Sequence, residues 1–199
     1  AYPQPIADTV TREIYGYEAL VRWFHPVRGA VPPTVFIPVA EKIGLINTLG
    51  EWVLKTACAE AASWATPLKV SVNVSPIQLM NTSLTDTIIG VLQQTGLDPR
   101  RLDLEITESD VFNENTRSLE ILSQLREQGI QISIDDFGTG YSSLSRLSYF
   151  PFDKIKIDRS FVINIPEQKD DLDIVRLIIS MGKSLHMRIA AEAWKPKSS

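Results

Sequence analysis

The sequence has little of the chemistry that marks disulfide-rich and zinc-binding proteins. Its 199 residues include one cysteine, Cys58, and two histidines, His25 and His186. One cysteine excludes an internal disulfide and a cysteine-rich zinc site, and two histidines are too few for a histidine-based metal centre. Cys58 lies in an apolar helical pattern with no histidine near it in sequence. We interpret it as a small buried side chain rather than a nucleophile.

Long apolar runs and excess positive charge are lacking as well. No apolar run reaches the roughly 18 residues that a membrane-spanning helix needs. Lysine and arginine total 20 against 24 aspartates and glutamates, which gives a net charge of −4. Without a basic run we expect no DNA binding, because such binding depends on neutralising phosphates. The chain begins with neither Met nor a leader pattern, which predicts a cytoplasmic piece of a larger protein, or the cytoplasmic part of a membrane-attached one.

The length and the residue pattern predict one α/β domain over residues 1–199, with no Pro/Gly/Ser-rich linker dividing it. Short β-branched runs alternate with longer amphipathic patterns, and the connections are long enough for parallel crossovers. We expect strands at residues 15–23, 68–74, 102–106, 130–134, 152–157 and 187–191. We expect helices at residues 34–46, 48–64, 83–95, 116–128, 142–149 and 170–185.

Polar residues recur at or near the carboxyl ends of the expected strands, and two of them, Glu18 and Lys156, lie inside the strand. These polar residues are Glu18, Asn73, Glu105, Asp135, Asp136, Lys156 and Glu192. In parallel α/β folds the strand ends meet at one face, where active sites form. The sequence therefore predicts that these side chains converge on one point.

Five carboxylates gathered in one place would repel one another, so the cluster requires a cation. Oxygen ligands of this kind suit Mg²⁺, Mn²⁺ or Ca²⁺, and two such ions about 3.5–4 Å apart would support phosphoryl chemistry. Lys156 would be the single cationic side chain of the cluster. Each residue alone also fits a structural role: a strand-end cap for Asn73, a paired lysine for Lys156, and a solvated face for Glu105 and Glu108.

These residues lie in motifs that resemble those of the EAL-domain cyclic di-GMP phosphodiesterases, and the resemblance runs over nearly the whole chain. The motifs include Tyr17-Glu18-Ala19-Leu20-Val21-Arg22-Trp23, Asn73-Val74-Ser75, Leu104-Glu105-Ile106-Thr107-Glu108, Asp135-Asp136-Phe137-Gly138-Thr139-Gly140, Lys156-Ile157-Asp158 and Ala191-Glu192.

The resemblance implies a TIM-like (β/α) barrel that hydrolyses cyclic di-GMP to linear pGpG with two Mg²⁺ or Mn²⁺ ions. It implies that the metal ligands are Glu18, Asn73, Glu105, Asp135 and Asp136. Lys156 and Glu192 would position and deprotonate the attacking water. Gln4, Leu20 and Arg22 would contact the substrate, and Glu108 would fix the loop 137–144. A homodimer and an attached sensory or GGDEF domain would be in keeping with the family.

The sequence departs from the family pattern after Glu192, where the family continues with Gly-Val-Glu, a helix, a glutamine and a last strand. Here residues 193–199 follow instead. At 199 residues the chain is also shorter than the roughly 250 residues of a complete barrel. We therefore expect a barrel that lacks its eighth strand. Two alternatives to an active enzyme stay open: a catalytically inactive cyclic di-GMP receptor or interaction module of the same fold, and a fragment that assembles with a partner chain or as a swapped dimer.

Overall fold

The computed structural model describes residues 2–8, 11–108, 116–138, 150, 152–163 and 169–191. The chain divides into two compact units, the first formed by Ala1–Leu104 and Glu120–Gln131, the second by Glu105–Leu119 and Ile132–Ser199. All three boundaries fall inside a helix or a strand rather than in a linker. A single domain over residues 1–199 stays a prediction.

The strands form one seven-stranded sheet in the order β1-β2-β5-β6-β7-β8-β9 and a separate hairpin, β3-β4. Their bounds are β1 Tyr2–Ala7, β2 Ile14–Leu20, β3 Trp23–His25, β4 Gly29–Val31, β5 Lys69–Asn73, β6 Leu102–Thr107, β7 Gln131–Phe137, β8 Lys154–Ile157 and β9 Arg188–Ala191. Within the units, β2 pairs with β5, β7 with β8 and β8 with β9, each in parallel. The predicted α/β alternation is confirmed.

The first strand departs from the parallel pairing that the long connections predict. β1 pairs antiparallel with β2, with Gln4 opposite Glu18. The turn between them is closed by a hydrogen bond from the amide of Asp8 to the carbonyl of Glu13, at 2.9 Å. A connection this short cannot carry a parallel crossover, which needs a dozen or so residues.

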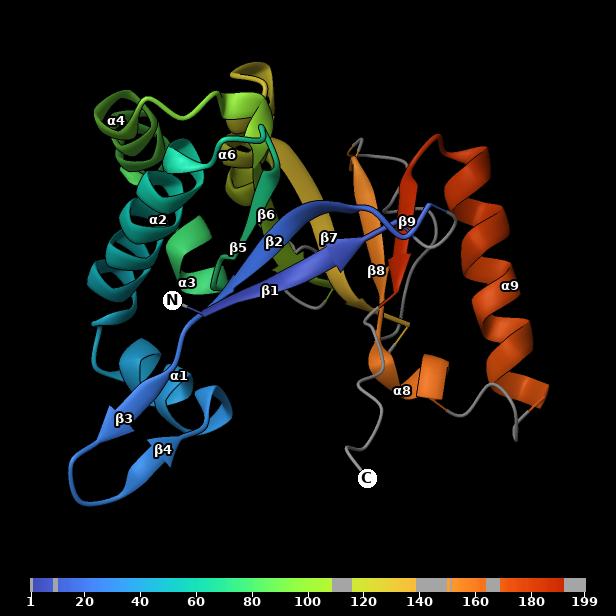
Figure 1. Ribbon diagram of the computed structural model, residues 1–199, viewed down its shortest axis with the longest axis horizontal. Coiled ribbons are helices and arrows are strands. Elements are labelled where there is room, and N and C mark those ends of the chain that lie inside the picture. Colours follow the sequence, from blue (N-terminus) through green and yellow to red (C-terminus); the bar gives the residue numbers. More distant parts are fainter. Residues whose placement is uncertain are drawn as a thin grey trace. The chain divides into compact units, whose positions relative to one another are not determined.

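In the first unit, helices α2 and α4 lie side by side (Figure 1). The helices of this part are α1 Pro33–Lys42, α2 Ile46–Ser63, α3 Pro76–Leu79, α4 Leu84–Thr95 and the 3₁₀ turn η1 Pro99–Arg101, together with α6 Thr116–Glu127 from Glu120 onward. α2 buries Val53, Leu54 and Cys58 on one face, and Cys58 is fully buried as predicted. α4 ends at Gly96, whose φ of 71° is the left-handed conformation that ends many helices.

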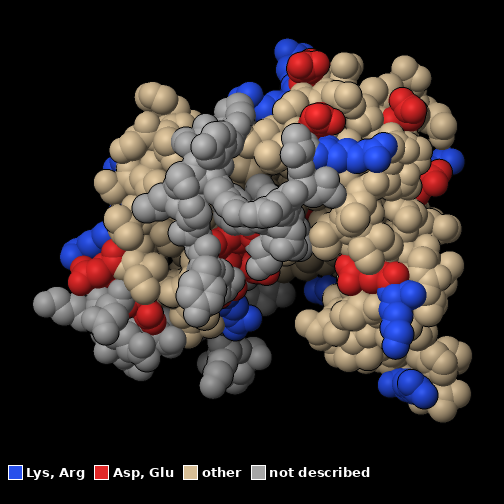
Figure 2. Space-filling model, turned by 180° about the vertical axis from the view of Figure 1, so that it is seen from behind, with Lys and Arg blue, Asp and Glu red and all other residues tan. Residues whose placement is uncertain are grey.

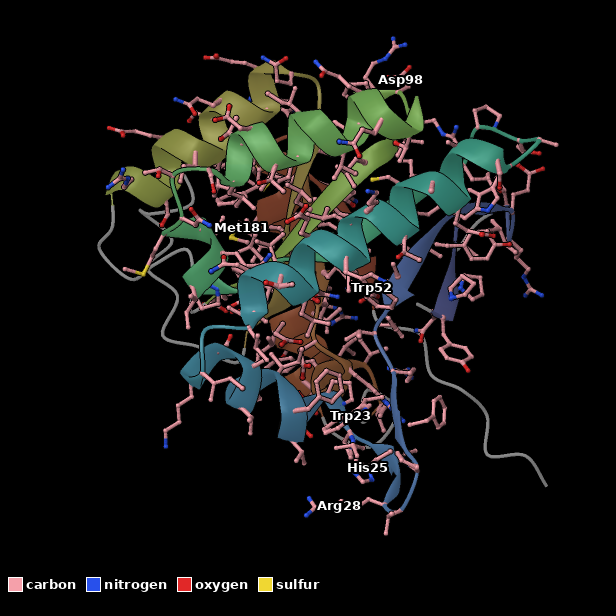
Figure 3. The ribbon with its side chains drawn as sticks, turned by 90° about the vertical axis from the view of Figure 1, so that its left-hand side faces the viewer. Trp23, His25, Arg28, Trp52, Asp98 and Met181 are labelled. Atoms are coloured by element: carbon pink, nitrogen blue, oxygen red, sulfur yellow. The ribbon has the colours of Figure 1, made fainter. Side chains whose placement is uncertain are left out.

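The β3-β4 hairpin was not expected, since the sequence predicted one strand over residues 15–23. β2 instead ends at Leu20, and the chain turns back on itself after His25. The His25 Nδ1 accepts hydrogen bonds from the amides of Val27 and Arg28, at 3.1 and 3.2 Å, which holds the turn. Figure 3 shows Trp23, His25 and Arg28 together on this hairpin.

In the second unit, helix α9 (Lys169–Ser184) packs beside β8 and β9, and the short helix α8 (Arg159–Ile163) contacts α9 (Figure 1). Val175 and Ile178 are the buried apolar residues of α9. The predicted helix at 142–149 lies outside the described residues. None of the helices among the described residues has the length and hydrophobicity needed to span a bilayer.

Candidate active site

The first unit brings together two of the predicted metal ligands. Glu18 lies on β2, and Asn73 is the last residue of β5, the neighbouring parallel strand. The Asn73 Nδ2 donates a hydrogen bond to the Glu18 Oε1 at 2.9 Å. The amide thus fixes the orientation of a carboxylate that is mostly buried.

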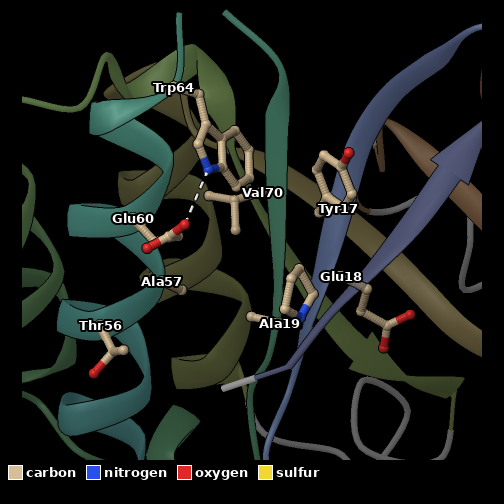
Figure 4. Close-up of a pocket in the computed structure, with 9 residues that line it drawn as sticks. Tyr17, Glu18, Ala19, Thr56, Ala57, Glu60, Trp64 and Val70 are labelled. Atoms are coloured by element: carbon tan, nitrogen blue, oxygen red, sulfur yellow. Dashed lines mark hydrogen bonds between the residues drawn. The ribbon is translucent and has the colours of Figure 1, made fainter. Parts of the chain in front are cut away.

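Residues on either side of Glu18 face a cavity of about 200 Å³ between α2 and strands β1, β2 and β5. Its walls include Tyr17 and Trp64, whose rings meet edge to face with centroids 5.1 Å apart, and Thr56 and Glu60 of α2. Glu18 also lines the cavity, but its carboxylate points away from α2, on the other side of β2 from Tyr17 and Ala19 (Figure 4). Strand alternation explains the difference, because consecutive side chains point to opposite faces of a sheet.

The predicted substrate contacts also lie in the first unit. Gln4 lies directly opposite Glu18 in the antiparallel ladder, so the two side chains share a face of the sheet. Leu20 is the last residue of β2 and is half-buried. Arg22 is exposed, and its Nη1 donates to the carbonyl of Val21 at 3.2 Å.

The second unit holds an ion-paired group around Lys156 of β8. The Lys156 Nζ lies 2.7 Å from the Glu105 Oε2 and 3.0 Å from the Asp135 Oδ2. Glu105 and Asp135 each offer a carboxylate oxygen within 4.8 Å of the other. The three side chains are less than a tenth exposed, so their attraction is screened far less than that of a surface pair.

A β-bulge brings both adjacent acids of β7 to this lysine. Ile134 pairs with Ile155 and Phe137 with Ile157, so Asp135 and Asp136 together face the single residue Lys156. Asp136 has a φ of 53°, and its amide donates to the Asp135 Oδ1 at 3.0 Å. The expectation that the two acids follow the strand is therefore wrong: β7 continues through them to Phe137.

Burial and the neighbouring carboxylates shift the pKa of the Asp136 carboxyl group. Loss of water around Asp136 raises the pKa of its carboxyl group, and the Asp135 and Asp158 carboxylates raise it further. The pKa of Asp158 is lowered, although burial opposes this, because it accepts hydrogen bonds from the hydroxyl and amide of Ser160. A cation beside Asp136 would favour its ionised form.

Glu108 lies just after β6 and is buried. Its Oε2 accepts a hydrogen bond from the amide of Gly138 at 2.9 Å, at the point where β7 ends. The rest of the loop to residue 144, and Glu192, lie outside the described residues.

A second buried lysine was missed by sequence reasoning. Lys154 is two residues before Lys156, and its Nζ lies 3.2 Å from the Glu105 Oε1. Period-two alternation along β8 places the two lysines on one face, and this signal was available in the sequence.

The donor set fits a hard divalent cation. In the second unit Glu105 and Asp135 are buried, and each could offer a carboxylate oxygen to a metal ion; Glu18 of the first unit is a buried carboxylate of the same kind. Such oxygen-only ligands suit Mg²⁺ and Mn²⁺ better than softer metals.

On the face seen in Figure 2, the described acidic and basic side chains are interspersed among other residues rather than gathered in one broad basic area.

The sequence family described as the EAL domain matches residues 1–193. The chain belongs to the EAL domain family. It is similar to the cyclic di-GMP phosphodiesterase NbdA of Pseudomonas aeruginosa, at 42% identity over 193 residues, which are 95% of this chain and 25% of NbdA. The chain thus spans about a quarter of this curated relative's length.

Two solved structures extend the likeness to the fold. The PaMucR phosphodiesterase in its cyclic di-GMP complex superposes with a TM-score of 0.92 at 40% identity, over 98% of this chain and 81% of that one. The manganese and cyclic di-GMP complex of Klebsiella pneumoniae BlrP1 gives a TM-score of 0.84 at 27% identity, over 97% of this chain and 48% of that one. The predicted α/β fold of the EAL TIM-like barrels is confirmed.

Proposed function

We propose that this EAL domain hydrolyses cyclic di-GMP to linear pGpG with the help of Mg²⁺ or Mn²⁺. The observation that carries the proposal is the buried Lys156 held between the carboxylates of Glu105 and Asp135. NbdA and PaMucR, both at least 40% identical, are named phosphodiesterases, and PaMucR was solved with cyclic di-GMP.

We assign the divalent cations to five ligands, namely Glu18, Asn73, Glu105, Asp135 and Asp136. Their oxygen donors and the burial of Glu18, Glu105 and Asp135 support the assignment. The BlrP1 complex contains manganese, which supports the choice of metal. When bound, such ions lower the pKa of water and polarise phosphoryl oxygens.

The chain's own residues then divide the remaining work. Lys156 holds the two carboxylates in place and orients the attacking water. Glu192 takes one proton of that water while the water oxygen bonds to phosphorus. The ester bond opposite breaks, and the departing ribose oxygen takes up a proton from solvent, to which Glu192 later returns its own. Gln4, Leu20 and Arg22 hold the dinucleotide, and the forked donors of Arg22 suit a phosphate.

In the whole protein we propose a cytoplasmic EAL domain joined to a sensory or GGDEF domain and working as a homodimer. Glu108, through its bond to Gly138, would keep the loop 137–144 in place for such assembly.

The test is turnover of cyclic di-GMP in Mn²⁺, with pGpG followed by chromatography, for the wild type, Glu18→Gln and the exposed control Glu13→Gln. We expect Glu18→Gln to lose at least about a hundredfold in rate, since even groups that only orient metal ligands contribute 10–100-fold. Glu13→Gln should behave as the wild type. Binding of cyclic di-GMP by a folded, Mn²⁺-loaded wild type without any product would instead identify a receptor.

A further inference from the structure

Strand β8 carries two buried lysines on one face, and the proposed chemistry uses only Lys156. The Lys154 side chain is 4% exposed, and its Nζ lies 3.2 Å from the Glu105 Oε1. A lysine almost never buries its ammonium group unless the charge is paired, because the loss of hydration is costly. The pairing with Glu105 therefore accounts for its position.

The two lysines divide the oxygens of Glu105 between them. Lys154 contacts Oε1, whereas Lys156 contacts Oε2 and also reaches Asp135. The four side chains form a continuous chain, Lys154–Glu105–Lys156–Asp135, with formal charges that sum to zero. In this arrangement the positive charges that balance the two acids come from the protein itself.

We propose that Lys154, two residues before Lys156 on the same face of β8, is a positioning residue that holds the carboxylate of Glu105. Through this contact it sets how strongly Glu105 and Asp135 bind a divalent cation. The proposal rests on the proposed function for the role of Glu105 as a metal ligand. The ammonium of Lys154 stabilises Glu105 when no metal is present and repels an arriving cation. Its loss should therefore weaken the metal-free protein and strengthen cation binding.

The experiment compares Lys154→Met with Lys183→Met, an exposed lysine of α9, using Mn²⁺ alone as the probe. Calorimetry gives the Mn²⁺ affinity, and thermal unfolding with and without Mn²⁺ gives the stability. We expect Lys154→Met to bind Mn²⁺ at least about tenfold more tightly, because a unit charge beside a buried cation is a strong interaction. Its metal-free Tm should fall and its Mn²⁺-induced rise in Tm should exceed that of the wild type. Lys183→Met should change none of these.

Unchanged or weaker Mn²⁺ binding by a folded Lys154→Met would overturn the proposal. If that variant does not fold without Mn²⁺, the pair Lys154→Arg and Lys154→Gln decides: Arg should keep the wild-type affinity and Gln should raise it, and equal affinities would refute the idea. Neither the Mn²⁺ affinity nor the stability measurement uses cyclic di-GMP, so both can be interpreted even if the protein does not turn over cyclic di-GMP. If the wild type binds no Mn²⁺, the proposed function fails. The role of Lys154 is then tested by the Tm of the metal-free proteins, and an unchanged Tm in Lys154→Met would overturn it.

Discussion

Replacing Gly138 by alanine tests the junction between β7 and the loop that Glu108 holds. Gly138 has a φ of +103°, a conformation that residues with a Cβ rarely adopt. A Cβ there would lie 2.9 Å from the Phe161 Cε2 and 3.5 Å from the Ile178 Cδ1. The amide of Gly138 must also stay 2.9 Å from the Glu108 Oε2, so the backbone cannot relax without loosening that hydrogen bond.

The expected loss of stability has two parts. The strained backbone costs about 1–2 kcal/mol for a residue with a Cβ. Overpacking against Phe161, a partly buried residue of α8, adds about 1–3 kcal/mol. We expect a loss of about 3 kcal/mol in the free energy of unfolding, or a fall in Tm of about 6–12 °C for a chain of this size.

Gly90→Ala is the matched control, because Gly90 lies inside α4 and an added Cβ would meet nothing within 4 Å. Alanine is the better helix former, so this variant should gain about 0.5–1 kcal/mol. Urea unfolding of both variants measures the difference. Equal stability of Gly138→Ala and the wild type, or equal shifts in the two variants, would refute the strain argument.

Two further predictions concern buried ionisable groups. Lys156→Met should lower the metal-free free energy of unfolding by about 3–5 kcal/mol in urea, because it leaves Glu105 and Asp135 without their shared cation; an unchanged midpoint would argue against the ion-paired group. Burial raises the pKa of the Cys58 thiol to about 12, so the folded protein keeps a proton that the unfolded chain loses above pH 9. Raising the pH from 8 to 10 should therefore cost the wild type about 1.4 kcal/mol more than it costs Cys58→Ala. An equal loss in both proteins would mean that the thiol ionises as readily in the fold as outside it.

The alternation of helices and strands was predictable because each element buries one apolar face, and apolar residues then recur about every 3.6 residues in a helix and every second residue in a strand. Strands β5, β6, β8 and β9 and helices α2, α4, α6 and α9 lie within a few residues of their predicted ranges. The burial of Glu105 and Asp135 beside Lys156 follows from the same reasoning, since residues at the ends of adjacent parallel strands approach one another.

Local turns and register shifts were not predictable from these periods. The β3-β4 hairpin depends on the His25 side chain capping two amides, which hydrophobic spacing does not record. The bulge in β7 depends on Asp136 adopting a positive φ, which the sequence alone does not reveal. Lys154 was missed although its period-two spacing from Lys156 is visible in the sequence, because a lysine is usually exposed to solvent and the burial of this one depends on its pairing with Glu105.

The most direct test of the central claim is the reversible dependence of pGpG formation on a divalent cation. The wild type is assayed with cyclic di-GMP after chelation and again after Mn²⁺ is added back, with Glu105→Gln treated in parallel. We expect no product without metal, restored product with Mn²⁺ in the wild type, and little or none in Glu105→Gln. Product that forms equally in chelator, or a folded wild type that binds Mn²⁺ and cyclic di-GMP yet yields no pGpG, would contradict this claim.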